Sequence, residues 1–392
     1  MQPRAPLTPL FALMAIRATG AFQLQSAAVA APSLIAEQGL SYAEIGMLIG
    51  AFMIPGIFLT VPGGLLAKRI GDRPVLRVAM VLMLAGGLLC AIAESFAVML
   101  AGRVLSGCGG VVMLMLVIKM TTDRYAGPML STATSMVIVS WPAGFALALV
   151  ALGPVGESLG WRWVLGLSGV PVACAIALTF LVGHAAPVPP PVAGSVERRV
   201  TWRFIAAASG NWTLYNAAIA VMAGFLPAFL ADAGRPAVAA AALASVVTWS
   251  FAAATPFGGL IADRLIGRPT AVILGAIATG VMLLAVAPAN GAVWVLVLLG
   301  IAYAIPPGAL TAQVGEGTPP AARALVFGWY SAGSYIGLTI APWIAGRLRD
   351  VTADPNAPLL FGAVLMFAML PCFAWFRYEL QRQGKKGWGV AP

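Results

Sequence analysis

Two arginines, Arg17 and Arg103, stand inside long apolar stretches of the sequence, where an ionised side chain is costly and usually has a function. Arg17 falls about ten residues into the first stretch, or roughly 15 Å at 1.5 Å per residue, which predicts a place near the middle of the membrane. A guanidinium there presents paired N–H donors that suit a carboxylate or another anion. The alternative is a structural arginine that donates to backbone carbonyls. We favour anion binding for Arg17 and leave both roles open for Arg103.

The acidic residues support the same chemistry. No Asp or Glu falls in the middle of an apolar stretch. A proton-driven exporter of organic cations usually needs a buried acid to exchange a proton for the charge of its cargo. The buried charge is instead positive, which predicts an anionic cargo.

Asn211, Trp212, Tyr215 and Asn216 follow the spacing i, i+1, i+4, i+5, which places them on one face of a helix. Aromatic rings can form the walls of a binding site, and amides and hydroxyls supply hydrogen bonds. Anchoring at the lipid interface is the alternative for aromatic residues, but this stripe lies too deep to fit it. The other side chains expected to contact a cargo are Gln25, Tyr303, Trp329 and Tyr330.

The sequence does not indicate catalysis. Its four cysteines lie in apolar stretches without a C-x-x-C pair, and His184 is the single histidine. It has no zinc-binding spacing and no phosphate-binding loop. We therefore predict that the protein is not an enzyme and has no cofactor or metal site.

The composition requires a membrane. Hydrophobic residues make up 60% of the chain and charged residues 9%, whereas soluble domains are about 25% charged. Backbone groups must be paired internally in lipid, which favours helices, and about twelve apolar runs approach the 20 residues that a spanning helix needs. The predicted fold is thus an all-α membrane protein. The expected spans are 8–33, 43–67, 75–97, 98–120, 129–152 and 162–184, then 203–231, 238–262, 270–288, 292–314, 323–345 and 358–377.

Charge predicts the orientation. The net charge of +10 does not indicate nucleic-acid binding, because the basic residues are dispersed among short loops. Lys and Arg are enriched roughly fourfold in the loops on the side of both termini, which predicts cytoplasmic termini in a bacterial-type inner membrane. The proline-rich stretch 185–201 is typical of a linker between two six-helix halves, 1–184 and 202–392, the second with a short tail.

Two further patterns concern helix breaks and duplication. The motif IPPGAL, residues 305–310, is expected to break the tenth helix, either for a binding site or as a packing kink. The stretch GGLLAKRIGDRP, residues 63–74, recurs as GGLIADRLIGRP, residues 258–269. The offset, 258 − 63 = 195, is about half of the 392 residues. The sequence therefore predicts a duplicated unit whose second and third helices are joined by this basic turn.

Two six-helix halves in a parallel repeat resemble the major facilitator superfamily. The basic turn resembles that family's motif between the second and third helices, and RVLSGCGG, residues 103–110, resembles its Arg-x-x-x-Gly-x-Gly motif. Lys68 stands where the family has an aspartate, which the second copy keeps as Asp263. The resemblance implies a role in conformational gating for Lys68, Arg69, Arg73, Asp263, Arg264 and Arg268.

The resemblance implies a secondary transporter that works by alternating access. With Arg17 as the buried cation, we predict a small organic anion as the cargo and a counter-anion or a proton as the coupled species. The end of the first helix faintly resembles cyanate- and nitroimidazole-type members. We expect a monomer surrounded by lipid, with no nucleic-acid partner. The alternative is a multidrug or hydrophobic-compound exporter of the same fold, which the aromatic walls permit and the missing buried acid disfavours.

Overall fold

The structure is a computed structural model that describes residues 7–125, 130–182, 200–319 and 322–385. This part of the chain is built from helices and contains no strand. The helices of the first half are α1 (Thr8–Gln38), α2 (Tyr42–Ala51), α3 (Ile54–Ile70), α4 (Asp72–Ala91), α5 (Phe96–Arg124), α6 (Leu130–Leu159), α7 (Trp161–Leu167) and α8 (Gly169–Leu178). Those of the second half are α9 (Trp202–Asp232), α10 (Ala237–Ile261), the π-helical turn η1 (Ala262–Ile266), α11 (Arg268–Ala285), α12 (Val293–Ala304), α13 (Pro306–Glu316), α14 (Arg323–Thr352) and α15 (Ala357–Lys385).

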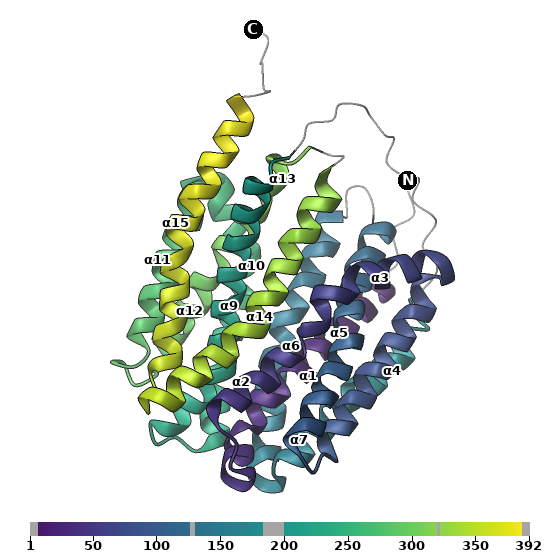
Figure 1. Ribbon diagram of the computed structural model, residues 1–392, viewed down its shortest axis with the longest axis vertical. Coiled ribbons are helices and arrows are strands. Elements are labelled where there is room, and N and C mark those ends of the chain that lie inside the picture. Colours follow the sequence, from purple (N-terminus) through teal and green to yellow (C-terminus); the bar gives the residue numbers. More distant parts are fainter. Residues whose placement is uncertain (1–6, 126–129, 183–199, 320–321, 386–392) are drawn as a thin grey trace.

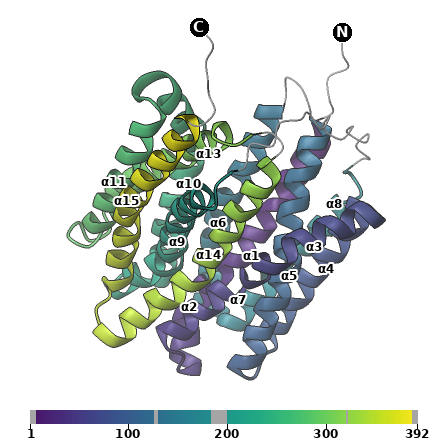
Figure 2. The ribbon, with the colours of Figure 1, turned by 45° about the horizontal axis from the view of Figure 1, so that its top comes forward.

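These helices make twelve crossings within the described chain. Ten stretches are long and apolar enough to span a membrane. Helices α1 and α14, with 31 and 30 residues, run alongside them and exceed the roughly 30 Å of hydrocarbon at 1.5 Å per residue. Four of the crossings consist of two consecutive elements each: α2/α3, α7/α8, α10/η1 and α12/α13. The predicted all-α membrane fold is confirmed, and Figures 1 and 2 show the helices of each half grouped side by side.

The sequence repeat extends through the folded chain. Helices α2 and α10 begin at Tyr42 and Ala237, and 237 − 42 = 195. Gly39 and Gly234, which precede them, share the same offset and are both left-handed, with φ of 66° and 84°. The repeat therefore relates positions of the first half to positions 195 residues later in the second. The predicted division at 185–201 stays a prediction, since residues 183–199 lie outside the described residues.

The π-helical turn η1 explains why the glycine that ends the helix lies one residue later in the second copy of the basic turn than in the first. Gly71 and Gly267 both end a helix with positive φ, 96° and 79°, but 267 − 71 is 196 rather than 195. A π turn takes up one extra residue in a helix, which moves the second glycine one place along. The register returns at Arg73 and Arg268 because the second copy has no counterpart of Asp72.

Several helices differ from their expected bounds. Helix α1 continues to Gln38 rather than ending at 33, so its middle falls at Gln23. Arg17 then lies six residues from that middle, about 9 Å toward the start of the helix, and its predicted depth in the membrane stays a prediction. The second crossing is broken between α2 and α3, where an unbroken helix was expected. The break predicted in the tenth crossing is confirmed between α12 and α13.

The bundle has two ends, which differ in the residues they carry. We call the end that carries the turns 68–73 and 263–268 the basic end, at the top of Figure 1, and the opposite one the Tyr42 end. Between them, glycines allow the helices to pack closely. A Cβ at Gly109 of α5 would lie 2.7 Å from the Met83 nitrogen of α4, so this position admits no larger side chain.

Candidate functional site

The guanidinium of Arg17 rests against an indole ring. Its Cζ lies 5.6 Å from the ring centroid of Trp141 on α6. The Trp141 ring also packs beside Gly20, one turn beyond Arg17, where a Cβ would lie 3.4 Å from Trp141 Cζ3. This cation–π contact holds a charged group inside the bundle and leaves its N–H edge for other partners.

Arg17 has no acidic partner in the described chain. None of its ion pairs involves Arg17. The Arg17 Nε is buried, and no hydrogen-bond acceptor among the described residues reaches it. The side chain as a whole is half-buried. A guanidinium held on an aromatic ring without a counter-charge is suited to receive an anion from outside the protein.

Tyr335 of α14 brings the second half of the chain to Arg17. It lies within electrostatic range of Arg17 and within hydrogen-bond range of Thr60 on α3. Its ring packs on Gly56, where a Cβ would lie 2.6 Å from the ring carbons. Trp141 was not among the predicted contacts; the sequence signal that could have found it is a tryptophan beside Pro142 inside an apolar run.

Arg103 is bound differently. Its Nε donates to the Leu48 carbonyl at 2.9 Å, Nη1 to Gln23 at 3.0 Å and Nη2 to Leu24 at 2.9 Å. The guanidinium lies 5.2 Å from the ring centroid of Phe52, and the residue is 2% exposed. Its donors satisfy backbone carbonyls of α1 and α2, so the geometry favours the structural alternative over the predicted contact with a cargo.

Three rings predicted from the sequence form an aromatic wall, which we define as Trp212, Tyr215 and Tyr330. Trp212 stacks on Tyr215, with centroids 5.4 Å apart, and on Tyr330 at 4.9 Å. The Tyr215 hydroxyl donates to the Tyr303 carbonyl at 2.6 Å, and the Tyr330 hydroxyl lies 3.2 Å from that of Thr311. Tyr215 and Tyr330 are buried, whereas Trp212 is half-buried and is the most exposed member of the wall.

Arg17 and Trp212 are equivalent positions of the repeat, since 212 − 17 = 195. The two helices that carry them, α1 and α9, begin within a residue of the same offset and contact one another. Residues related by a repeat of this kind lie at the same depth on opposite sides of the axis between the halves. The first half therefore offers a cation where the second offers an aromatic ring.

The remaining predicted contacts take different positions. The amides of Asn211 and Asn216 donate to carbonyls of their own helix, both at 2.8 Å. The Asn211 Oδ1 and the Tyr303 hydroxyl are buried without a partner among the described residues. Gln25 donates across the halves to the Ala223 carbonyl at 2.8 Å. Trp329 is 49% exposed and meets Trp202 edge to face toward the basic end, which suits an interface anchor better than a wall.

The two halves touch backbone to backbone at the Tyr42 end. A Cβ at Gly46 of α2 would lie 2.8 Å from the Trp343 Cα of α14, and one at Gly50 would lie 2.9 Å from the Thr339 carbonyl carbon. Figure 1 shows these two helices crossing near its lower edge. The parts of the same crossings toward the basic end expose Leu66 and Trp329 instead. The structure is therefore closed between α2 and α14 at the Tyr42 end.

Charged groups reinforce this closure. Asp350 of α14 accepts hydrogen bonds from the backbone amides of Tyr42 and Ala43 at 2.9 and 2.8 Å. The Arg349 guanidinium lies over the Tyr42 ring at 3.9 Å, donates to its hydroxyl at 2.8 Å and pairs with Asp232. Arg349 is 6% exposed, so these interactions are shielded from water.

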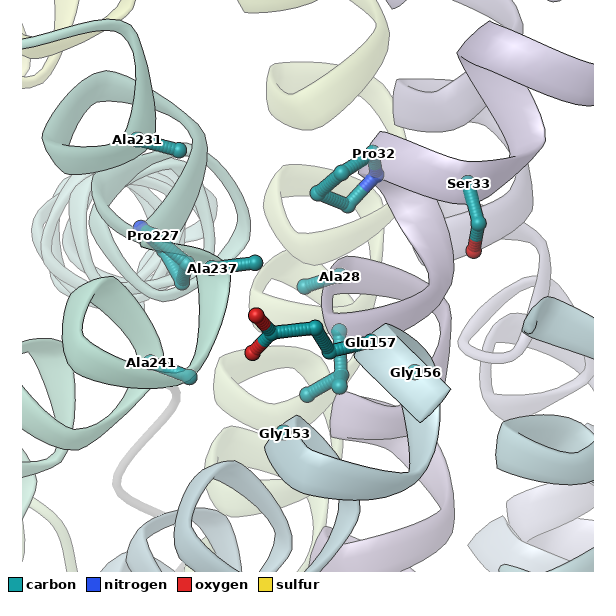
Figure 3. A pocket seen from close by; sticks show the side chains of 11 residues that line it. Ala28, Pro32, Ser33, Gly153, Gly156, Glu157, Pro227, Ala231, Ala237 and Ala241 are labelled. Atoms are coloured by element: carbon teal, nitrogen blue, oxygen red, sulfur yellow. The ribbon is translucent and has the colours of Figure 1, made fainter. Parts of the chain in front are cut away.

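A small cavity of about 50 Å³ remains between the halves at this end. It is lined by parts of α1, α6, α9 and α10, including Ser33, Gly153, Pro227 and Ala241. Figure 3 shows the Glu157 carboxylate directed into it from α6. The volume suits one or two waters rather than an organic cargo, so this cavity belongs to the closed end.

Ion pairs at the basic end stay within each half. In the first half, Lys119 of α5 pairs with Asp72 at 2.6 Å and with Asp123 at 3.1 Å. In the second, Arg268 of α11 pairs with Asp263 at 2.6 Å and with Glu316. Each set connects the basic turn to another crossing of its own half. In the first half the turn contributes the acid of that connection, Asp72, whereas in the second half it contributes the base, Arg268.

The other predicted gating residues differ in their exposure. Lys68, Arg69 and Arg264 are exposed, and Arg73 is half-buried. The gating role of these residues stays a prediction. No group of three metal-binding side chains exists within the described part of the chain.

Comparison with known proteins gives the family. A sequence model of the Major Facilitator Superfamily matches residues 12–234 and again 208–390. The inner membrane transport protein YajR of Escherichia coli is 30% identical over 149 residues, which are 38% of this chain and 32% of that protein. Azole resistance protein 1 of Saccharomyces cerevisiae is 32% identical over 135 residues, 33% of this chain and 21% of that protein. The matches thus span about a third or less of these relatives.

Solved structures share the whole fold. A bacterial homologue of the human lysosomal transporter Spinster, in an inward-facing and unoccupied conformation, superimposes with a TM-score of 0.77 at 17% identity, covering 99% of this chain and 100% of that one. A D-xylose–proton symporter gives 0.75 at 17% identity, with 93% and 96% covered. With both halves of the chain matched by the family's sequence model, the protein belongs to the major facilitator superfamily and is a membrane-spanning transporter.

Proposed function

We propose that this transporter moves a small organic anion by alternating access, with Arg17 as the group that binds the negative charge. The observation that carries the proposal is the Arg17 guanidinium, held on Trp141 and without an acidic partner in the described chain. Tyr335 of the other half lies within electrostatic range of the same group. We expect a cargo bound there to contact both halves. Its interactions then change when the halves rock, so that binding is coupled to the motion.

The orientation of the proposed cycle follows from charge. The positive-inside rule places the basic end and both termini in the cytoplasm of a bacterial-type inner membrane. The closed Tyr42 end then faces outward, and Arg17 is reached from the cytoplasmic side. We expect the unit of function to be the monomer, because each chain contains both halves of the site.

A second candidate is export of multidrug or hydrophobic compounds. It is favoured by relatives named Azole resistance protein 1 and, at 29% identity over 157 residues, putative multidrug resistance protein MdtD of Klebsiella pneumoniae. The aromatic wall suits such compounds as well. It is disfavoured by the position of the acids, which in the described helices lie toward the helix ends rather than beside the wall.

Binding to purified Arg17 variants separates the two candidates. Acetate, benzoate, nitrate and the cation ethidium are titrated by calorimetry, and melting temperatures are recorded on the same samples. Arg17→Gln should weaken anion binding roughly ten- to a hundredfold, the loss of one charge-assisted interaction of about 1.5–3 kcal/mol. The anion affinity of Arg17→Lys should fall between those of the wild-type protein and Arg17→Gln, since lysine keeps the charge but lacks the paired N–H donors of a guanidinium. Normal anion affinity in a well-folded Arg17→Gln protein would instead favour export of multidrug or hydrophobic compounds.

A further inference from the structure

The charges around Arg17 restrict what its ligand carries. Arg17, Arg103 and Arg377 are the basic residues set deepest from the helix ends in the described chain. Arg103 donates to three carbonyls, and Arg377 donates to the Gln313 Oε1 at 3.1 Å. Arg17 alone of these three has no hydrogen bond to another described residue. One available cation balances one negative charge, and a second charge of either sign would be buried without a partner.

The rest of the surroundings is aromatic. A carboxylate on the N–H edge of Arg17 lies beside the Trp141 ring, whose centroid is 5.6 Å from the guanidinium, and beside Tyr335. Ring surfaces and ring edges favour contact with another aromatic ring over an aliphatic group of equal size. The part of the ligand that adjoins the carboxylate therefore lies against the Trp141 ring of the first half, with Tyr335 of the second half within electrostatic range.

The equivalent position in the second half carries a ring as well. Trp212 occupies the position in the second half that Arg17 occupies in the first, and it is the half-buried member of the aromatic wall. Its stacking on Tyr215 and Tyr330 fixes the indole, so little side-chain freedom is lost when a ligand packs on it. Of the two positions related by the repeat, Arg17 in the first half thus carries the positive charge and Trp212 in the second half carries the aromatic ring.

We infer that the cargo is a monovalent aromatic carboxylate, with its carboxylate on Arg17 and its ring between Trp141 and Trp212. This inference rests on the proposed function, of which it names the substrate class. Inorganic anions lack an organic group that could pack on the aromatic wall. Dicarboxylates and zwitterions carry a second charge that has no partner there.

The test is a ligand series in which charge and ring are varied separately. Wild-type protein in lipid nanodiscs is titrated by calorimetry with benzoate, cyclohexanecarboxylate, acetate, phthalate and benzyl alcohol. Benzoate should bind about threefold to tenfold more tightly than cyclohexanecarboxylate, because the two differ in the aromatic ring and little else. Benzyl alcohol and phthalate should each bind at least about tenfold more weakly than benzoate.

Variants then locate the ring. Trp212→Leu should remove the preference for benzoate over cyclohexanecarboxylate while the affinity for acetate is kept, and Trp212→Phe should retain most of it. Trp294→Leu is the matched control, because that tryptophan is 62% exposed at the start of α12 and far from the wall in sequence. It should leave every affinity unchanged.

The outcomes distinguish this inference from the proposed function. Equal affinity for benzoate and cyclohexanecarboxylate in the wild-type protein would overturn the aromatic class while leaving an anion transporter. A neutral ring compound that binds as tightly as the carboxylates would overturn both. If Trp212→Leu does not fold, the wild-type series and Trp212→Phe still decide the question.

Discussion

Asp350 and Tyr42, 308 positions apart in the chain, are joined at the Tyr42 end of the two halves: a carboxylate oxygen of Asp350 accepts a hydrogen bond from the Tyr42 backbone amide at 2.9 Å. The other oxygen accepts the amide of Ala43 at 2.8 Å. The first amides of a helix have no partner within the helix and carry partial positive charge. A carboxylate of the second half thus caps α2 of the first half, and this cap exists only while the Tyr42 end is closed.

Asp350→Asn should therefore shift the protein toward the state that is open at the Tyr42 end. The amide loses the charge and one of two acceptor oxygens, a loss of about 1.5–3 kcal/mol. The shift can be followed by labelling Ser33→Cys, in the cavity of Figure 3, with a membrane-impermeant thiol reagent in a background without native cysteines. Asp354→Asn is the control, since Asp354 accepts bonds from its near neighbour Asn356. Equal labelling of the two variants would count against the cap.

Gly46→Ala should have the same direction of effect for a steric reason. The added Cβ meets the backbone of α14 only 2.8 Å from the Trp343 Cα, and backbone cannot turn aside as a flexible side chain can. Labelling of Ser33→Cys should rise severalfold. Gly259→Ala, in another helix and with open space around its Cβ position, should leave labelling unchanged.

Arg103→Gln should lower stability without changing the affinity for carboxylates. Three charge-assisted hydrogen bonds to backbone carbonyls are lost, so the melting temperature should drop by several degrees. The control is Arg162→Gln, because Arg162 also donates to two backbone carbonyls but is exposed to solvent. A stable Arg103→Gln protein with weakened anion binding would instead indicate that Arg103 binds the cargo.

Transport should proceed by exchange or facilitated flux, or be coupled through an acid near the surface. Glu44 accepts from Ser41 at 2.8 Å in a capping box, and Glu94 is exposed. Proteoliposomes with an imposed pH gradient and radiolabelled benzoate give the measurement. Strong proton-driven accumulation that persists in the double variant Glu94→Gln and Glu44→Gln contradicts this prediction.

The two arginines show how far the site could be predicted from the sequence. Both were found from composition alone, because any charge inside an apolar run is conspicuous. Their separate roles were not, since the carbonyls that bind Arg103 lie 55 to 80 positions away in the chain. Trp141 escaped prediction for the same reason: its contact with Arg17 depends on the packing of α6 on α1 beside Gly20.

The sequence by itself determined that the protein crosses the membrane as about twelve helices in two repeated halves. Those properties depend on local rules, namely the length of apolar runs, the need to pair backbone groups in lipid and an offset of 195 visible in the residues. The tertiary structure decided which cation is left without an acceptor, which rings stack beside it and which end of the bundle is closed. Such choices depend on contacts between helices remote in sequence, and lipid-exposed apolar runs pack in many ways unless glycines, aromatic rings and ion pairs select one of them.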